Sequence, residues 1–580
     1  MKNKMKLTTG WYVLIFLFVG FAQSATAANE VPVADTVLLG GKVLTVDADD
    51  TIVEAVAIKG GRILAVGSTK EIRALAEPNT RVIALDGKTV IPGIVAAHCH
   101  AIGVARQSLV APHAELLSVA DVQDWVRKRA KELPAGRWIR IPRTDITRMK
   151  ERRHPTTAEL DAASTTHPVY FNAARKTALN TKGYAAIGIT ADTKTVPGGE
   201  IIRDEKGNLR LLSGAGALLG KAMPRAELSD DAVRSALRNV HARYNAVGIT
   251  SIFERAANKS QYELYQSLRD ADELTVRTNV TIRQQFRTGE AVETFSKKLG
   301  LKTGDGDDWV RVGPLKISVD GGIHWGNTHL REEYGEKRIR FYIHKDPAYR
   351  GQLNYSVDQM TDIFAAGHKL GWQMCCHVTG DAGVDRILDA LEAVHKKQPL
   401  ADKRFTLTHA YFPAVDSIKR AKKLGMCVDT QSSLYYKDSD AIAEFYGKPW
   451  AARFMGLGDW IRGGIPTAIA GDHMLGLDPD TAMNAYSPFL MLYVAVARKN
   501  RAGRVYGPHQ KLTRQQALRC VTTHPAYLAF DEKKKGTLEP GKFADLVVLD
   551  RDYLTCPESE IRIIRPKLTM LDGKIVFQAK

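Results

Sequence analysis

Residues 90–100 read Val-Ile-Pro-Gly-Ile-Val-Ala-Ala-His-Cys-His, an apolar run that ends in two histidines separated by one residue. We interpret Val90–Ala97 as a buried strand, because a short apolar run bounded by turn residues is typical of one. Residues i and i+2 of an extended chain face the same way, so the imidazoles of His98 and His100 can reach one cation. Such a pair is weak evidence for a metal site by itself, and its position at the end of a strand strengthens that evidence.

The chain beyond this run alternates short apolar strands with amphipathic helices, for example at 356–370, 381–397 and 415–424. This alternation is typical of a parallel sheet with crossover helices. Eight strands is the number found in a TIM barrel. The candidate strands are Val90–Ala97, Val247–Phe253, Thr275–Ile282, Pro314–Val319, Trp372–Cys376, Phe405–Thr408, Met426–Thr430 and Pro466–Ala470.

The two ends of the chain carry another pattern, short apolar stretches joined by glycine turns. Sequence alone does not prove that these ends meet, but they would suit one sandwich. The predicted fold class is therefore α/β, a (β/α)8 TIM barrel with a composite β-sandwich and a large insertion after the first barrel strand. The insertion is interpreted as a cap over the barrel mouth. The predicted boundaries are 28–88 and 536–580 for the two parts of the sandwich, 89–535 for the barrel and about 101–245 for the insertion.

The composition is that of a soluble globular protein, with 44% apolar and 25% charged residues in 580. It argues against disorder, collagen-like repeats and a polytopic membrane protein. The net charge of +18 raises the question of nucleic-acid binding, but no aromatic-rich basic cluster accompanies it, so we expect no nucleic-acid partner. The six cysteines show no paired spacing, and we expect small buried residues without a redox role.

The first 27 residues resemble a secretory signal peptide. Three lysines precede an apolar run at 11–22, and Ala25-Thr26-Ala27 provides the pattern of small residues that a signal peptidase cleaves. The run is shorter than the roughly 20 residues needed to span a bilayer. We expect cleavage after Ala27, a periplasmic or secreted protein and no stable membrane insertion afterwards. An uncleaved N-terminal anchor is the alternative.

Metal-ligating side chains recur at further candidate strands, at the carboxyl ends where barrel active sites form. His377, His409 and Asp472 follow the ends of strands, and Lys316 lies within another strand. One such histidine alone would more often be a solvent-facing or hydrogen-bonded residue. Four histidines and one aspartate in the same topological position indicate a shared site. Asp381 is expected to stand at the start of a helix and to cap it or to support the metal ligands, rather than to bind metal.

This set of residues on successive strands resembles the amidohydrolase superfamily of metal-dependent hydrolases. Residues 90–93 before His98-Cys99-His100 are similar to its first-strand signature, and residues 536–546, Gly-Thr-Leu-Glu-Pro-Gly-Lys-Phe-Ala-Asp-Leu, are similar to its return into the sandwich. Residues 315–321 and 377–382 resemble one branch, the enzymes similar to N-substituted formamide deformylase (amidohydrolase family 3). The resemblance covers essentially the whole chain after residue 27. It implies hydrolysis of carbon–nitrogen bonds other than peptide bonds.

A centre with two divalent metal ions is expected on this basis. Lys316 cannot ligate a cation as an ammonium, so the resemblance implies its carboxylation to a bridging carbamate; a salt-bridged lysine beside a single metal stays open. Zinc suits these ligands, with manganese, iron or nickel as alternatives. Asp472 is expected to accept the proton of the attacking water and to deliver it to the leaving nitrogen. The predicted ligands are His98, His100 and Asp472 for one ion, His377 and His409 for the second, and Lys316 between them.

The sequence departs from the family pattern in places. Ala96 stands where an acidic residue is usual, and Asp472 follows Ala470-Gly471 instead of Gly-Ser. Arg175 stands where the family often has a histidine near the substrate. Its guanidinium would favour a substrate with a carboxylate, an ordinary surface arginine being the alternative. Further candidates for lining the pocket are His324, Trp325 and Tyr435.

Three classes of function follow from these features. The first is a metal-dependent amidohydrolase acting on a small formamide, N-acyl or cyclic amide. The second is an esterase or lactonase of the same fold, since the same hydroxide attacks any acyl carbon. The third is a non-catalytic exported binding or regulatory protein, which we would expect to have lost metal ligands, whereas none is missing here. A homo-oligomer is compatible with the sequence.

Overall fold

The computed structural model describes residues 32–223 and 226–580. The predicted signal peptide, residues 1–27, lies outside the described residues. Among the helices of the described part, none is both long and apolar enough to cross a bilayer. All six cysteines are buried and unpaired, as expected.

Eight parallel strands form the central sheet, and its two edge strands are bridged at their carboxyl ends. The Asp472 backbone N–H donates to the His98 carbonyl at 3.1 Å, and that of His100 to His473 at 3.0 Å, which joins the two edges. The predicted barrel is confirmed. In the order in which they neighbour one another, the strands are β8 (Ile94–Cys99), β14 (Ile249–Ala257), β15 (Arg277–Arg283), β16 (Val310–Ser318), β17 (Met374–Val378), β18 (Thr406–His409), β19 (Cys427–Thr430) and β20 (Thr467–Ile469).

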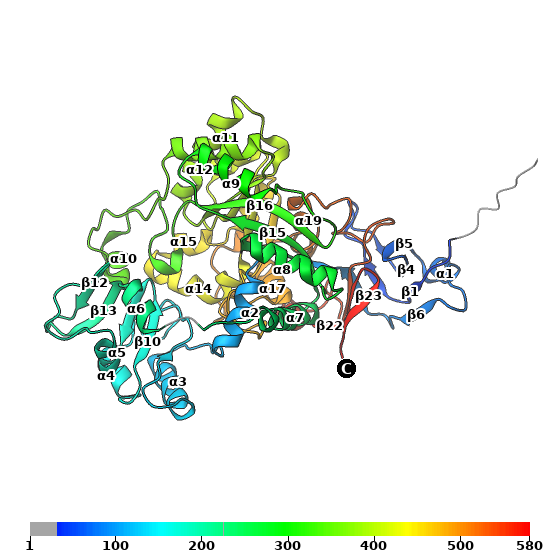
Figure 1. Cartoon of the computed structure of the whole chain (residues 1–580). Coiled ribbons are helices and arrows are strands. Elements are labelled where there is room, and N and C mark those ends of the chain that lie inside the picture. The colour runs from blue at the N-terminus through cyan, green and yellow to red at the C-terminus, as the bar shows by residue number, and fades with distance from the viewer. Residues whose placement is uncertain (1–31, 224–225) are drawn as a thin grey trace, which may run out of the picture.

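Helices alternate with these strands and surround the barrel (Figure 1). Several of them begin at a side-chain cap, as in α11, where the Ser356 hydroxyl accepts from the Gln359 backbone N–H and the Gln359 side chain returns to Ser356. The helices are α7 (Asp230–Ala246), α8 (Lys259–Asp270), α9 (Gly289–Leu299), α11 (Val357–Lys369), α12 (Asp381–His395), α13 (Val415–Lys423), α14 (Ser432–Phe445), α15 (Lys448–Arg453), α16 (Leu457–Arg462), α17 (Pro488–Ala497), α18 (Arg514–Arg519) and α19 (Thr523–Leu528).

The apolar run that opens the barrel is divided at Gly93, and this corrects the prediction of one strand over Val90–Ala97. Residues before the glycine form β7 (Thr89–Pro92) of a different sheet, and residues after it form β8. A Cβ atom at Gly93 would lie 2.2 Å from the Thr250 hydroxyl oxygen of β14. Only glycine allows this close approach, and it stands at the point where the chain passes from one sheet to the other.

Both ends of the chain build a two-sheet sandwich. Val90 of β7 pairs with Val43 on one side and Val548 on the other, so strands far apart in sequence share one sheet. The two sheets enclose a buried apolar core that includes Leu38, Ile58, Leu546 and Met570. The smaller sheet holds β1 (Thr36–Leu39), β4 (Ala55–Lys59), β5 (Arg62–Gly67) and β6 (Arg81–Ala84), with helix α1 (Thr69–Arg73) between the last two; the larger holds β2 (Lys42–Leu44), β3 (Ile52–Val53), β7, β21 (Leu546–Leu549), β22 (Pro566–Leu571) and β23 (Lys574–Gln578).

The segment between β8 and β14 forms a separate five-stranded sheet with short helices. Figure 1 shows this insertion and the sandwich on opposite sides of the barrel. The Lys176 ammonium donates to the Tyr342 carbonyl at 2.8 Å, which ties the insertion to α10 (Gly335–Tyr342) of the barrel chain. Its elements are α2 (Ala101–Val110), α3 (Val119–Glu132), β9 (Ile139–Arg140), α4 (Thr157–Asp161), β10 (Val169–Ala173), β11 (Lys176–Leu179), α5 (Thr181–Ala186), β12 (Gly199–Arg203), β13 (Leu209–Gly214) and α6 (Gly216–Ala222).

Candidate metal centre

The end of β8 brings two imidazoles to one carboxylate. Ala96 pairs with Ile252 and Cys99 with Glu254, so β8 has one residue more than β14 between these pairs. Such a bulge redirects the side chains that follow it. The Nε2 atoms of His98 and His100 lie 3.3 and 3.2 Å from the same Asp472 oxygen, Oδ1. The convergence expected from the spacing of the two histidines is therefore present.

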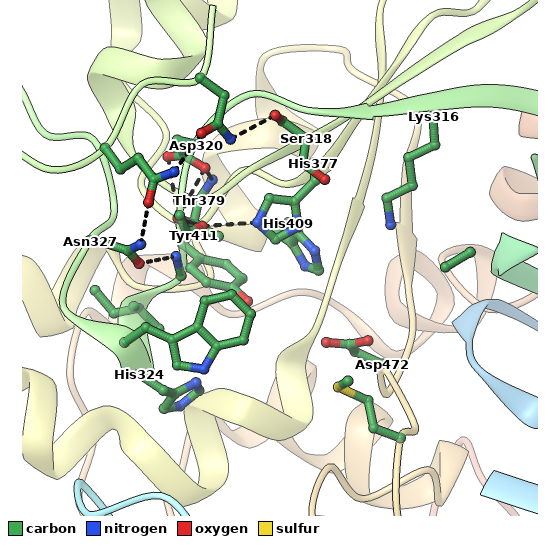
Figure 2. Close-up of a pocket in the computed structure, with 18 of the residues that line it drawn as sticks. Lys316, Ser318, Asp320, His324, Asn327, His377, Thr379, His409, Tyr411 and Asp472 are labelled. Atoms are coloured by element: carbon green, nitrogen blue, oxygen red, sulfur yellow. Dashed lines mark hydrogen bonds between the residues drawn. The ribbon is translucent and has the colours of Figure 1, made fainter. Parts of the chain in front are cut away.

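All six predicted ligands line one cavity of about 540 Å³ at the carboxyl ends of the strands. Figure 2 shows Lys316, His409 and Asp472 around the same space. The tightest group is His98, His409 and Asp472, whose ligand atoms all lie within 4.8 Å of one another. The His377 ring follows at 4.5 Å from that of His409. The His409 ring therefore lies between those of His377, at 4.5 Å, and His98, at 4.9 Å, and the assignment of these ligands to two separate ions stays a prediction.

Hydrogen bonds orient three of the imidazoles by occupying the nitrogen that faces away from the cavity. Each bond leaves the other ring nitrogen available, and this is how metal-binding histidines are usually held. The bonds join His98 Nδ1 to Asp429 Oδ1 at 2.9 Å, His409 Nδ1 to Gln431 Oε1 at 2.7 Å, and His377 Nε2 to the Gly321 carbonyl at 2.9 Å.

Asp429 of β19 is the centre of a buried polar network beneath the site. Its Oδ2 forms an ion pair with Arg255 Nη2 at 2.7 Å and accepts a hydrogen bond from the Thr408 hydroxyl at 3.1 Å. Its Oδ1 accepts from the Gln431 amide at 3.1 Å in addition to His98. Asp429 and Arg255 are both fully buried, so each charge depends on the other.

Burial keeps three imidazoles of the site neutral, those of His98, His377 and His409. It lowers the pKa of His98 and His409 well below the ordinary value and that of His377 to about 4, and neighbouring positive or imidazole groups add to the effect. Burial alone would raise the pKa of Asp472, but the surrounding imidazoles hold it below the usual carboxylate range. Neutral imidazoles beside an ionised carboxylate are the forms that bind a cation.

Lys316 is the sixth member of the group and is only 4% exposed. Burial lowers the pKa of its amine. Its ammonium nitrogen has no hydrogen-bond or ion-pair partner within residues 32–223 and 226–580. Among the described residues no carboxylate forms a salt bridge with it, and the amine faces the cavity (Figure 2).

The backbone is strained at two of the ligands. His409 has a φ of 80° and Asp472 a φ of 52°, in the left-handed region that residues with a side chain rarely adopt. Asn484 supports the second of these, because its amide donates to the Asp472 carbonyl at 2.9 Å. Strain of this kind is concentrated at functional sites, where surrounding contacts hold it in place.

Comparison with known proteins identifies the family. The family model described as "Amidohydrolase family" matches residues 81–577, which is most of the chain. This chain belongs to the amidohydrolase family. The match confirms the predicted family and the predicted class of enzyme, a hydrolase of carbon–nitrogen bonds.

Relatives of this amidohydrolase align over most of their length. N-substituted formamide deformylase of Arthrobacter pascens is 28% identical over 561 residues, covering 94% of this chain and 98% of the relative. Protein LONG AFTER FAR-RED 3 of Arabidopsis thaliana is 24% identical, with 89% and 87% covered. A metal-dependent hydrolase of Pyrococcus horikoshii has a TM-score of 0.66 at 20% identity, covering 90% of this chain and 99% of the other, which supports the fold.

Three of the four further candidates line the cavity of the amidohydrolase. His324 Nε2 lies 3.0 Å from Asp438, and Trp325 lies beside Arg175, whose Cζ is 5.6 Å from the ring centroid. Tyr435 does not line the cavity: it is buried, and its hydroxyl donates to the Arg498 and Tyr506 carbonyls. Its expected place in the pocket is corrected, because α14 turns this side chain toward α17 and the loop that follows.

The amidohydrolase site contains residues that sequence reasoning missed. Asp429 and Gln431 lie at the end of β19 and Arg255 lies on β14, both strands that were predicted. The sequence signal that could have indicated these residues is the presence of polar side chains in otherwise apolar strands. Tyr411 also lines the cavity, two residues after His409, and its hydroxyl has no partner among the described residues. Asp381 is the first residue of α12 but does not cap it, because Gly380 is the N-cap and no side chain caps this helix; Asp381 accepts from the Arg331 backbone N–H, outside the cavity.

Proposed function

We propose that this amidohydrolase cleaves a non-peptide carbon–nitrogen bond of a small amide at a binuclear metal centre. One observation carries the proposal: His98 Nε2 and Asp472 Oδ1 are buried without a hydrogen-bond partner in the described chain, in the group that also holds His409. Leaving two such atoms unpaired would be costly, and a cation satisfies both.

The donor set suits divalent zinc. Imidazole nitrogens with one carboxylate oxygen are ligands that zinc accepts readily, while manganese, iron and nickel bind similar sets. His100 extends the group on the side of Asp472, and His377 extends it on the side of His409. A carbamate on Lys316 would supply a further anionic ligand; it would form when the neutral amine attacks CO₂ and one proton is released.

A divalent ion supplies two effects in such a site, a bound water that ionises near neutral pH and polarisation of the substrate carbonyl. The residues of the chain do the rest. Asp472 accepts a proton at Oδ2, the oxygen that is not assigned to the metal, and returns it to the leaving nitrogen, while the Asn484 amide lies 3.4 Å from the same oxygen. Tyr411 can donate a hydrogen bond to the carbonyl oxygen of the substrate from the cavity wall.

The proposal is tested by metal content and by a hydrolysis screen on the same protein. Elemental analysis of the chain purified with added metal should find about two divalent ions per chain, and a K316M variant should retain fewer. The screen compares formamides, N-acyl amino acids and cyclic amides with esters and lactones. N-substituted formamides come first because a relative is named for them. Loaded protein that hydrolyses esters or lactones but no amide would contradict the proposal.

We further propose that the mature protein is exported. The pattern of residues 1–27 supports cleavage after Ala27. Sequencing the N-terminus of protein recovered from the periplasm or the medium tests this. A mature chain that begins at Ala28 is expected, and an intact leader in a membrane fraction would contradict it.

A further inference from the structure

Four arginines line the cavity without a carboxylate to neutralise them. Arg143 and Arg175 come from the insertion, and Arg283 and Arg287 come from the end of β15 and the loop after it. Among the described residues, none of the four has an Asp or Glu oxygen within ion-pair distance. Arg255 differs from all of them, because it has its own partner in Asp429. The cavity therefore holds an excess of positive charge that the protein does not balance.

The acidic residues of the cavity are engaged elsewhere. Asp320 accepts from the backbone N–H groups of Thr379 and Gly380, each at 2.8 Å. Asp145 lies 3.6 Å from Arg148, and Asp472 belongs to the metal group. Like charges gathered in one concave site repel one another, and a cavity lined by one sign of charge concentrates ions of the opposite sign.

The arginines divide into two pairs by the elements that carry and contact them, Arg143 with Arg175 and Arg283 with Arg287. The guanidinium carbons of Arg143 and Arg175 each lie 5.6 Å from the centroid of the Trp325 ring. Arg283 donates to the Ser318 hydroxyl at 3.3 Å, and Arg287 donates to the Asn354 carbonyl at 3.2 Å. These contacts use neutral acceptors and few of the guanidinium N–H groups. The remaining donors of each pair are available to an anion.

A chain of hydrogen bonds links the two pairs along one wall. Arg175 donates to Gln352 at 2.9 Å, Gln352 donates to Asn354 at 2.6 Å, and the Asn354 amide donates to the Ser318 carbonyl at 2.9 Å. Ser318 in turn accepts from Arg283 through its hydroxyl. Fixed contacts of this kind hold the pairs at a constant separation, so a ligand with two anionic groups can meet both without rearranging the wall.

We propose that the substrate is a dianion, a small amide that carries two carboxylates, with one arginine pair for each. This inference rests on the proposed function for the amide bond of the substrate, whereas its two negative charges are inferred from the arginines. The cavity volume of about 540 Å³ suits a small molecule and excludes a long polyanion such as a nucleic acid. Carboxylates match the planar guanidinium, which binds them through two parallel hydrogen bonds.

Binding of simple carboxylates tests the two charges without any reaction. The affinities of glutarate, a dicarboxylate, and butyrate, a monocarboxylate, are measured by calorimetry on the metal-loaded protein. A metal ion can bind one carboxylate of either compound. The ratio of the two affinities therefore reports a site for the second carboxylate. Glutarate is expected to bind about 10- to 100-fold more tightly. In R283M/R287M this ratio should fall toward one, whereas R127M on α3, an exposed arginine paired with Asp124, should keep it. Equal binding of the two acids to the unmodified protein, or an unchanged ratio in R283M/R287M, would overturn the inference.

Hydrolysis of a matched series separates this inference from the proposed function. The series is N-formylglutamate, N-formylglutamine and N-formylbutylamine, which lose one carboxylate at each step. We expect kcat/KM to fall about tenfold or more at each step. Equal rates on all three would leave the amidohydrolase activity in place and reject the dianion. No hydrolysis of any amide together with preferred glutarate binding would reject the proposed function and support the anion site.

Discussion

Replacement of Asp429 by asparagine tests how the protein prepares His98 for a metal ion. One oxygen of the Asp429 carboxylate forms an ion pair with Arg255, and the other accepts hydrogen bonds from His98 and Gln431. An asparagine of the same shape must turn its oxygen toward the Arg255 cation, because its NH₂ group would be repelled there. The NH₂ group then faces His98 Nδ1, which must become an acceptor. The proton of His98 moves to Nε2, the nitrogen that faces the cavity and must be free to bind a metal.

Two magnitudes follow from this geometry. Loss of a carboxylate that orients a ligating histidine weakens metal binding about 10- to 100-fold. Removal of one charge from a buried pair costs about 3 to 5 kcal/mol of stability, because the other charge is left uncompensated. D429N should therefore lose both metal affinity and stability, the first measured by competition with a chelator and the second by urea unfolding of the metal-free protein.

The control is a buried pair of the same kind away from the site. Asp545 of the sandwich return accepts from Arg277 at 2.9 Å, and their side chains are 4% and 2% exposed. D545N should lose stability, though less than D429N because Arg277 keeps Asp572 at 2.9 Å, and it should keep its metal affinity. If D429N binds metal as tightly as the unmodified protein while it loses stability like D545N, then Asp429 does not set the tautomer of His98 and the reasoning is refuted.

Three further outcomes are expected. D472N should keep most of its metal but lose about 10²- to 10⁴-fold in kcat, measured on the best amide of the screen; full activity would remove Asp472 as the proton acceptor. Burial of His241, stacked on Tyr265 with neither ring nitrogen bonded in the described chain, lowers its pKa to about 3. The unfolded chain therefore takes up a proton at this histidine before the folded chain does, and the free energy of unfolding decreases as the pH falls from about 6.5 toward 3. The H241F variant should remove about 2 kcal/mol of that decrease at pH 5. Urea unfolding at several pH values should show this as a flatter pH dependence of stability. G93A should destabilise by about 1 to 3 kcal/mol through the contact with Thr250, and G93A/T250A should recover part of this loss in the same assay.

The barrel was predictable because its strands are short apolar runs that end in reactive side chains. His377 and His409 follow such runs directly, and the structure places both at the carboxyl ends of strands β17 and β18. The division of the first run at Gly93 was not predictable from the same signal. Two strands of different sheets give one continuous apolar segment, and only the contact with Thr250 separates them.

The site was predictable where a residue is recognisable by its chemistry. Histidine next to a strand end is such a signal, and the six ligands lie around one cavity. The network below them was missed, because an aspartate and an arginine inside strands can serve many purposes. The four arginines without an ion-pair partner lie in separate segments of the sequence, at 143, 175, 283 and 287. No local sequence pattern relates these segments, because they meet only in the folded protein.

The placement of both chain ends in one sandwich has a consequence for the order of folding. β7 continues through Gly93 into β8, so the strand that carries His98 is anchored in the sandwich. Half of the strands in that anchoring sheet follow residue 545. A nascent chain that has not yet reached them already contains all six cavity residues but lacks the antiparallel neighbour of β7. The metal centre can reach its final geometry only after the last segment to be synthesised has paired with one of the first.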